Sequence, residues 1–157
     1  MVTINDIIKE IGKTIYDEFG ELYDIYTEVV KQGFKEPCFF ITNISSDQSL
    51  YVGERYLITN EFCIQYFPLD CENPKHECHD VGQKLYRCLE YIDPGELLIG
   101  SNMHYEIVDG ILNFLINYNF FARKETLKSK VENLNHNVKA KEWLKLKSTI
   151  KQTMKKI

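Results

Sequence analysis

The chain has 157 residues, of which 44% are hydrophobic and 13% aromatic, so the composition excludes a wholly disordered protein and fits one domain with an appendage. No apolar run approaches the roughly 18–20 residues that span a bilayer, and no membrane partner is expected. The formal charge of −4 hides two opposed parts, because residues 1–122 carry eight Lys and Arg against 20 Asp and Glu (−12), whereas residues 123–157 carry 11 against three (+8).

The first predicted element is a helix over residues 4–19. Isoleucines recur with helical spacing from Ile4 to Ile15, and Phe19 completes the apolar stripe. Thr3 or Asn5 can cap its start, and Gly20 suits its end. The early charges of this helix do not fit the layout of a signal peptide, so we expect a protein that is not exported by the usual route.

A β-rich stretch is predicted next. Residues 23–27 alternate between apolar and polar, and residues 38–44 form an apolar run that opens at Pro37 and is typical of a central strand. The polar residues 45–49 predict a loop. A long strand follows over residues 54–67, and Pro68 ends it.

A second helix is predicted over residues 74–92, and the turn signature Asp93-Pro94-Gly95 leads to a short strand over residues 97–99. Two further β-type runs, 104–108 and 111–120, are joined by Asp109-Gly110. This dipeptide between alternating runs predicts a hairpin with a type I′ turn.

Residues 124–157 are rich in lysine, lack Gly and Pro, and predict two helical pieces separated near residues 133–137. The expected fold is therefore α+β, with two helices packed on one face of a mostly antiparallel or mixed β-sheet and a basic C-terminal helical arm. The expected domains are residues 1–122 and the arm, residues 123–157.

One group of residues suggests metal or nucleophile chemistry. Cys71, His76, Cys78 and His79 are the densest set of possible ligands, but their spacing matches no standard zinc site, and Cys78 falls on the apolar stripe of the second helix. A solvated loop leading into a helix is the preferred interpretation. The five cysteines, an odd number, fit a reduced compartment in which most are buried apolar side chains. We predict no catalytic residue, metal or cofactor.

The basic arm is the remaining candidate for a binding site. Its lysines can solubilise a helix, dock on an acidic protein surface or bind phosphates. The arm has ten lysines to one arginine and a single aromatic residue, whereas nucleic-acid recognition favours arginine forks and aromatic stacking, so nucleic acid is not the expected partner. The lysines that we select as contact candidates are Lys139, Lys141, Lys145, Lys147 and Lys151.

Three segments taken together carry a resemblance. Residues 32–41 (QGFKEPCFFI), 66–68 (YFP) and 105–114 (YEIVDGILNF), in this order after an isoleucine-rich first helix, resemble the phage tail terminator family of Gram-positive phages and phage-tail-like particles. The resemblance covers roughly residues 1–122.

The resemblance implies a structural protein of the virion tail or of a tail-like bacteriocin, assembled in the bacterial cytoplasm. It implies a hexameric ring that caps the tail tube, ends tube polymerisation, and meets the head–tail connector or collar and, in a contractile tail, the sheath. Neither a cofactor nor a reaction is implied. The contact residues that we predict in the body are Ser46, Asp47, Gln48, Asp109 and Gly110. The alternatives are a nucleic-acid-binding module that uses the arm and a small enzyme centred on residues 71–79.

Overall fold

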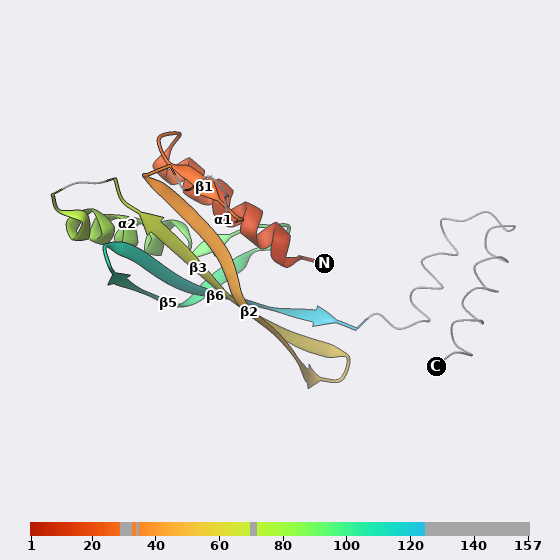
Figure 1. Ribbon diagram of the computed structural model, residues 1–157. Helices are drawn as coiled ribbons and strands as arrows, with labels where there is room; N and C mark the ends of the chain where they lie inside the picture. Colours follow the sequence, from red (N-terminus) through yellow and green to blue (C-terminus); the bar gives the residue numbers. More distant parts are fainter. Residues whose placement is uncertain (29–32, 34, 70–71, 125–157) are drawn as a thin grey trace, which may run out of the picture. The chain divides into compact units, whose positions relative to one another are not determined.

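The computed structural model describes residues 1–28, 33, 35–69 and 72–124 (Figure 1). Residues Met1–Ala122 form one compact unit. The predicted helical arm lies outside the described residues except for Arg123 and Lys124. The elements in chain order are α1 (Ile4–Phe19), β1 (Asp24–Tyr26), β2 (Cys38–Val52), β3 (Arg55–Phe67), α2 (Pro74–Cys88), β4 (Tyr91–Ile92), β5 (Leu98–Val108) and β6 (Ile111–Arg123).

Helix α1 confirms the prediction for the first element at both ends. Thr3 is the N-cap and forms a capping box with Asp6, in which each side chain accepts a hydrogen bond from the backbone N–H of the other residue. Gly20 ends the helix with φ of 88°, a conformation that glycine adopts at little cost.

The six strands form one sheet in the order β1-β2-β3-β6-β5-β4. Strand β1 pairs with β2 in parallel, and β2–β3, β4–β5 and β5–β6 are antiparallel. Asn60 on β3 donates to the carbonyl of Tyr118, and Gln65 donates to Asn113, so numbering rises on β3 as it falls on β6. Strands β3 and β6 are therefore antiparallel as well, and the sheet is mixed.

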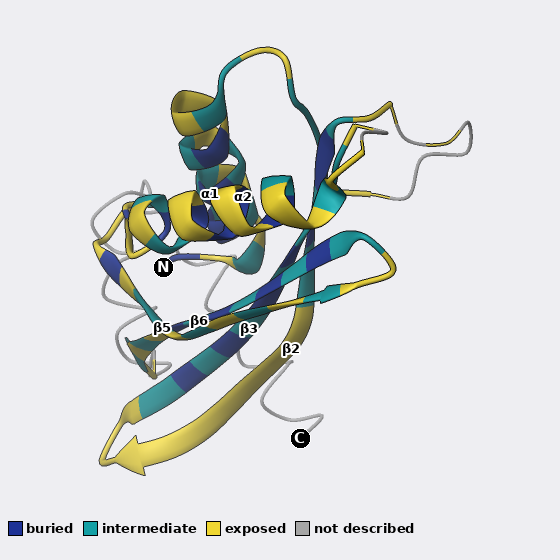
Figure 2. Cartoon of the chain, turned by 90° about the vertical axis from the view of Figure 1, so that its left-hand side faces the viewer, coloured by how far each residue is buried: buried dark blue, intermediate teal, exposed yellow. Residues whose placement is uncertain are grey.

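Both helices lie on the same face of this sheet, as predicted (Figures 1 and 2). Buried side chains of α1 and α2 join alternate residues of the strands in one core, because successive residues of a strand point to opposite faces. The opposite face of β3 and β6 carries half-buried residues at the alternate positions and has no described helix over it. The core contributions that show this alternation most clearly are Phe62, Ile64 and Tyr66 of β3 and Leu112, Phe114, Ile116 and Tyr118 of β6.

The prediction of a loop at residues 45–49 is wrong. These residues belong to β2 and pair with β3 from Ser45↔Glu61 to Ser49↔Leu57. The pairing is templated by a two-residue turn at Gly53 and Glu54, where Gly53 has the positive φ (60°) that a type II′ turn requires at its first position. Polar side chains are compatible with this strand because both of its faces are exposed here.

The C-terminal limit of the second helix was also predicted incorrectly. Helix α2 ends at Cys88 with Leu89 as its C-cap, whereas Ile92 lies in β4 and pairs with Leu98. Ile92 remains buried, but it reaches the core from a strand. The spacing of Ile92 from Leu85 fits the apolar stripe of a helix. Only the pairing of Ile92 with β5 shows that it belongs to a strand.

The short strand at 97–99 and the strand at 104–108 are parts of a single strand, β5. Between Ser101 and His104 a β-bulge places two residues opposite one residue of β6. The bulge changes which residues face the core, from Leu98 and Gly100 before it to Tyr105 and Ile107 after it. This change of phase made one strand look like two. The predicted hairpin is confirmed, since Asp109 and Gly110 have φ of 52° and 77° between Val108 and Ile111.

Candidate interaction surface

The hairpin of β2 and β3 extends beyond the helices, and the far part of β2 is exposed on both sides, whereas Ile58 and Asn60 of β3 are buried (Figure 2). Ser46, Asp47 and Gln48 lie in this part of β2. Ser46 and Gln48 pair with Asn60 and Ile58, which face the helix side, so Asp47 between them faces the opposite side of the sheet. The three predicted contact residues are thus exposed, but they belong to two different surfaces.

Ser46 also connects the hairpin to the rest of the sheet. Its hydroxyl donates to Asn60 Oδ1 at 2.7 Å, and Asn60 Nδ2 donates to the Tyr118 carbonyl at 3.3 Å. Asn60 is fully buried, and these two bonds satisfy its amide. Ser46 and Gln48 border a depression of about 220 Å³, whose other side is formed by residues 1–4. Ser46 therefore has a structural role in the folded unit.

The tip of the hairpin carries an apolar group that the sequence reasoning did not select. Leu50, Tyr51 and Val52 are 60–65% exposed, and the ring of Tyr51 lies 5.1 Å from that of Phe121 on β6. The guanidinium of Arg55 lies 5.4 Å from the centroid of the Phe121 ring. We call Leu50, Tyr51, Val52 and Phe121 the tip cluster. The three consecutive apolar residues before Gly53 were the available sequence signal, because such runs are unusual on a solvated ribbon.

Asp109 and Gly110 lie at the other end of the sheet. The β2–β3 pairing runs from Val52↔Arg55 at the hairpin tip to Cys38↔Phe67, which lies beside the Asp109-Gly110 turn. The structure therefore does not bring Ser46, Asp47 and Gln48 together with Asp109 and Gly110. The turn borders a depression of about 350 Å³ lined mainly by residues 67–69 and by Glu36 and Pro74. The carbonyl of Gly110 accepts a weak hydrogen bond from the buried Cys78 thiol at 3.6 Å.

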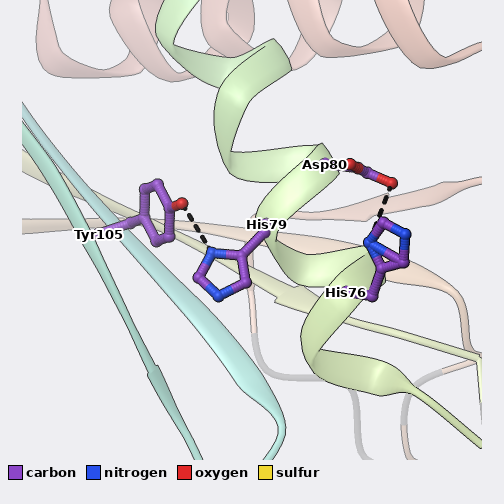
Figure 3. Close-up of polar contacts among 4 residues, drawn as sticks. All are labelled: His76, His79, Asp80 and Tyr105. Carbon is purple, nitrogen blue, oxygen red and sulfur yellow. Dashed lines mark hydrogen bonds and ion pairs between the residues drawn. The ribbon is translucent and has the colours of Figure 1, made fainter.

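The candidate ligands His76, Cys78 and His79 point in different directions. His76 Nδ1 lies 3.7 Å from Asp80 Oδ2, and His79 Nδ1 lies 2.9 Å from the hydroxyl of Tyr105 (Figure 3). Helical geometry explains the divergence, since neighbouring positions lie about 100° apart around the axis. Among the described residues no three His, Cys, Asp or Glu side chains are grouped for a metal ion, and Cys71 lies outside them.

Three of the described cysteines have the electrostatics of structural thiols. Burial raises the pKa of Cys38 to about 11 and that of Cys88 to about 12, and it raises the pKa of Cys63 as well. These thiols are protonated at neutral pH, whereas a nucleophilic cysteine needs a lowered pKa. Lys139, Lys141, Lys145, Lys147 and Lys151 lie outside the described residues, so the structure assigns them no position.

The described unit is thus a small α+β domain that presents a strand ribbon, a tight turn and an open sheet face, features typical of a protein that works through surface contacts. No described helix is long and apolar enough to cross a membrane. The chain belongs to the phage tail terminator family, because the family model described as "Phage tail terminator protein" matches residues 6–130.

This match confirms the resemblance drawn from residues 32–41, 66–68 and 105–114, and it extends from the first turn of α1 past the end of β6. Membership in the family implies a structural role in completing the phage tail and a place in the virion tail. No curated protein matches this chain.

Proposed function

We propose that the protein forms a ring that caps the end of the tail tube of a phage or of a phage-tail-like bacteriocin and thereby ends tube polymerisation. The observation that carries this proposal is the family match over nearly the whole described fold. Six copies per ring is the number that the resemblance implies. A closed ring repeats one interface between unlike surfaces of neighbouring copies, so each copy needs two complementary faces.

In this proposal the two ends of the sheet contact different neighbours. Cyclic symmetry places the same end of every copy on the same side of the ring. The tip cluster then forms a circle of apolar contacts for the tail tube protein, and the Asp109-Gly110 turns face the connector or collar. The exposure of Leu50, Tyr51 and Val52 supports this assignment, because clustered apolar surface commonly marks a binding site.

The basic arm adds a second kind of contact. Residues 123–157 carry +8 and residues 1–122 carry −12, so six arms would bring +48 to one assembly. Several weak charge contacts reinforce one another once the first has formed, because the remaining arms are held at a high effective concentration. We infer that the arms bind an acidic surface of a neighbouring ring, of the collar or, in a contractile tail, of the sheath.

The tip cluster provides the test of the capping proposal. Replacing both Tyr51 and Val52 by serine should leave folding intact, since both side chains are more than half exposed. We expect tails of uncontrolled length in cells that carry this variant, as in cells that lack the protein, measured by electron microscopy of purified tails. The matched control is Ile99→Ser, because Ile99 is also exposed but lies on β5, away from the hairpin tip. Cells that carry this control should give tails of normal length.

Tails of normal length in cells that lack the protein would contradict the capping function. Normal length with the Y51S/V52S variant alone would contradict only the role of the tip. Retention of the full-length protein on DNA at physiological salt would instead favour the nucleic-acid alternative.

A further inference from the structure

The two outer edges of the central sheet lack partners over long stretches. Strand β1 covers only Cys38–Phe40 of β2, and β4 covers only Leu98 and Ile99 of β5. Within the described part of the chain, no backbone pairs with β2 from Ile41 onward on its outer side, or with β5 from Ser101 onward. Among the described residues, each stretch therefore presents backbone groups without a strand partner, although the carbonyl of Ser45 accepts from the Asn43 amide and that of Asn102 lies 3.1 Å from His104 Nδ1.

The edge of β2 has little of the protection that exposed edges usually carry. Natural proteins block such edges with lysine, proline, bulges or short strands. Residues 41–52 contain neither lysine nor proline, and Asp47 is their only charged side chain. Its two irregularities, at Asn43/Ser45 and Leu50/Val52, leave the regular segment 45–50 between them.

The edge of β5 offers a regular segment of similar length. After the bulge at Ser101/His104, residues 104–108 pair regularly with β6 on their inner side. Three antiparallel steps, β2–β3, β3–β6 and β6–β5, separate the two edges, so β2 and β5 run in opposite directions. A second copy that continues the sheet thus brings its β5 antiparallel to β2 of the first.

We propose that neighbouring copies of this chain join by strand pairing, with residues 47–50 of β2 in one copy bound to residues 105–108 of β5 in the next. The proposal rests on the ring function above and names the interface that builds the ring. Because the two edges belong to different strands, the contact is head-to-tail and can repeat around an axis until it closes. Backbone hydrogen bonds supply the affinity, as in other cases of strand addition.

Side-chain chemistry selects one register for this pairing. Residues 45, 47 and 49 share the open face with residues 104, 106 and 108. Placing Asp47 opposite Glu106 sets like charges face to face, which is unfavourable. Placing Ser49 opposite Glu106 avoids this, sets Asp47 beside Val108, and brings the exposed Leu50 against Tyr105 on the helix side. Placing Asp47 opposite His104 would pair only residues 45–47 with residues 104–106, because β2 is irregular before Ser45. The register with Ser49 opposite Glu106 is therefore the one that we assign.

Disulfide trapping tests the interface in the full-length protein purified in its tail particles. Ser49→Cys combined with Glu106→Cys should give, on oxidation, a ladder of cross-linked multimers in non-reducing gels. A one-to-one mixture of the two single variants should give dimers and no larger species, because each copy then carries one new thiol. The matched control is Gln48→Cys with Glu106→Cys, whose side chains point to opposite faces and cannot reach the geometry of a disulfide.

We expect at least a tenfold higher yield of multimers from S49C/E106C than from the Q48C/E106C control or from the wild-type protein, whose native cysteines set the background. Equal yields, or dimers from S49C alone, would overturn the proposed pairing. Only monomer bands from a variant that still caps tails would refute the interface and leave the capping function intact. A full ladder from a protein whose loss does not change tail length would refute capping and leave the interface intact.

Discussion

Two glycines inside helices show how single residues set the packing in this fold. A Cβ on Gly12 of α1 would lie 3.8 Å from Ile25 and Ile41, an ordinary van der Waals contact. A Cβ on Gly82 of α2 would lie 2.8 Å from the ring of Tyr105 on β5. Gly82 is therefore the point of close approach between α2 and the sheet, and Gly12 is not such a point.

Alanine at these two positions should change the free energy of unfolding in opposite directions. Gly82→Ala should lower the free energy of unfolding by about 1–3 kcal/mol, because the ring of Tyr105 must move in a packed region. Gly12→Ala should raise it by up to about 1 kcal/mol through helix propensity. Urea denaturation of both variants checks this pair. A Gly82→Ala protein as stable as the Gly12→Ala protein would show that α2 is not held against Tyr105.

The capping box at Thr3 and Asp6 makes a prediction about acid stability. The backbone N–H of Thr3 donates to the Asp6 carboxylate, and this bond, aided by the Thr3 hydroxyl, lowers the pKa of Asp6 below its ordinary value of 3.8. A lowered folded-state pKa means that the stabilisation is present above the ordinary value and is lost as the pH falls through the folded-state value.

Asp6→Asn should therefore destabilise the protein at neutral pH, and the difference from the wild-type protein should shrink as the pH falls below 3.8. Thermal unfolding of both proteins between about pH 2 and pH 7, which includes the range over which a carboxylate titrates, measures this stability difference. Asp17→Asn is the control, because that residue is exposed and lies outside the capping box. A pH-independent difference would mean that the charge of Asp6 is not what stabilises the helix start.

At the scale of elements, the two hairpins differ in how their turns are built. The β5–β6 turn needs positive φ at both Asp109 and Gly110, whereas the β2–β3 turn needs it only at Gly53. The Asp-Gly signal was therefore readable from the sequence, and the Gly-Glu pair at residues 53 and 54 was not as distinctive. The polar run at residues 45–49 led to the prediction of a loop, because the sequence alone did not reveal its pairing partner.

The β5–β6 turn gives a prediction that is free of packing effects. No atom lies within 4 Å of a Cβ built on Gly110, so Gly110→Ala adds only backbone strain. We expect a loss of about 1–2 kcal/mol in the free energy of unfolding, measured by urea denaturation. Asp109→Asn should be nearly neutral, because asparagine tolerates the left-handed conformation. An unchanged stability of the Gly110→Ala protein would argue against the type I′ turn.

At the scale of the whole molecule, the acidic part of the sequence coincides with the described fold. All described elements end by Arg123, and the acidic unit Met1–Ala122 contains the core. The strand β6 runs past Phe121, so a truncation at that residue would cut into the sheet. A chain that ends at Lys124 keeps every strand and removes nearly all of the basic residues beyond the fold.

We predict that the chain ending at Lys124 unfolds thermally as the full-length protein does, because it retains the whole core. It should bind purified tails more weakly, and the binding of the full-length protein should weaken as salt rises, since screening acts on exposed charges. Sedimentation of the protein with tails at low and high salt measures both effects. Equal binding by the truncated chain at every salt concentration would remove the arm from the proposed assembly.

The sequence alone determined the elements whose signals are local. Isoleucine spacing and caps predicted α1, Asp109-Gly110 predicted its hairpin, and the order of three segments pointed to the family that the family model confirms. The helix and the hairpin depend on neighbours within a few positions of each other, so periodicity and turn chemistry reveal them.

Only the tertiary structure decided the features that depend on distant partners. Pairing with β3 made residues 45–49 a strand, pairing with β5 moved Ile92 from a helix to β4, and the bulges set which residues face the core. The same is true of the candidate surface, where alternation placed Asp47 on a different face from Ser46 and Gln48. The sequence specifies which residues are apolar, but which of them stay exposed depends on how strands far apart in the chain are brought together.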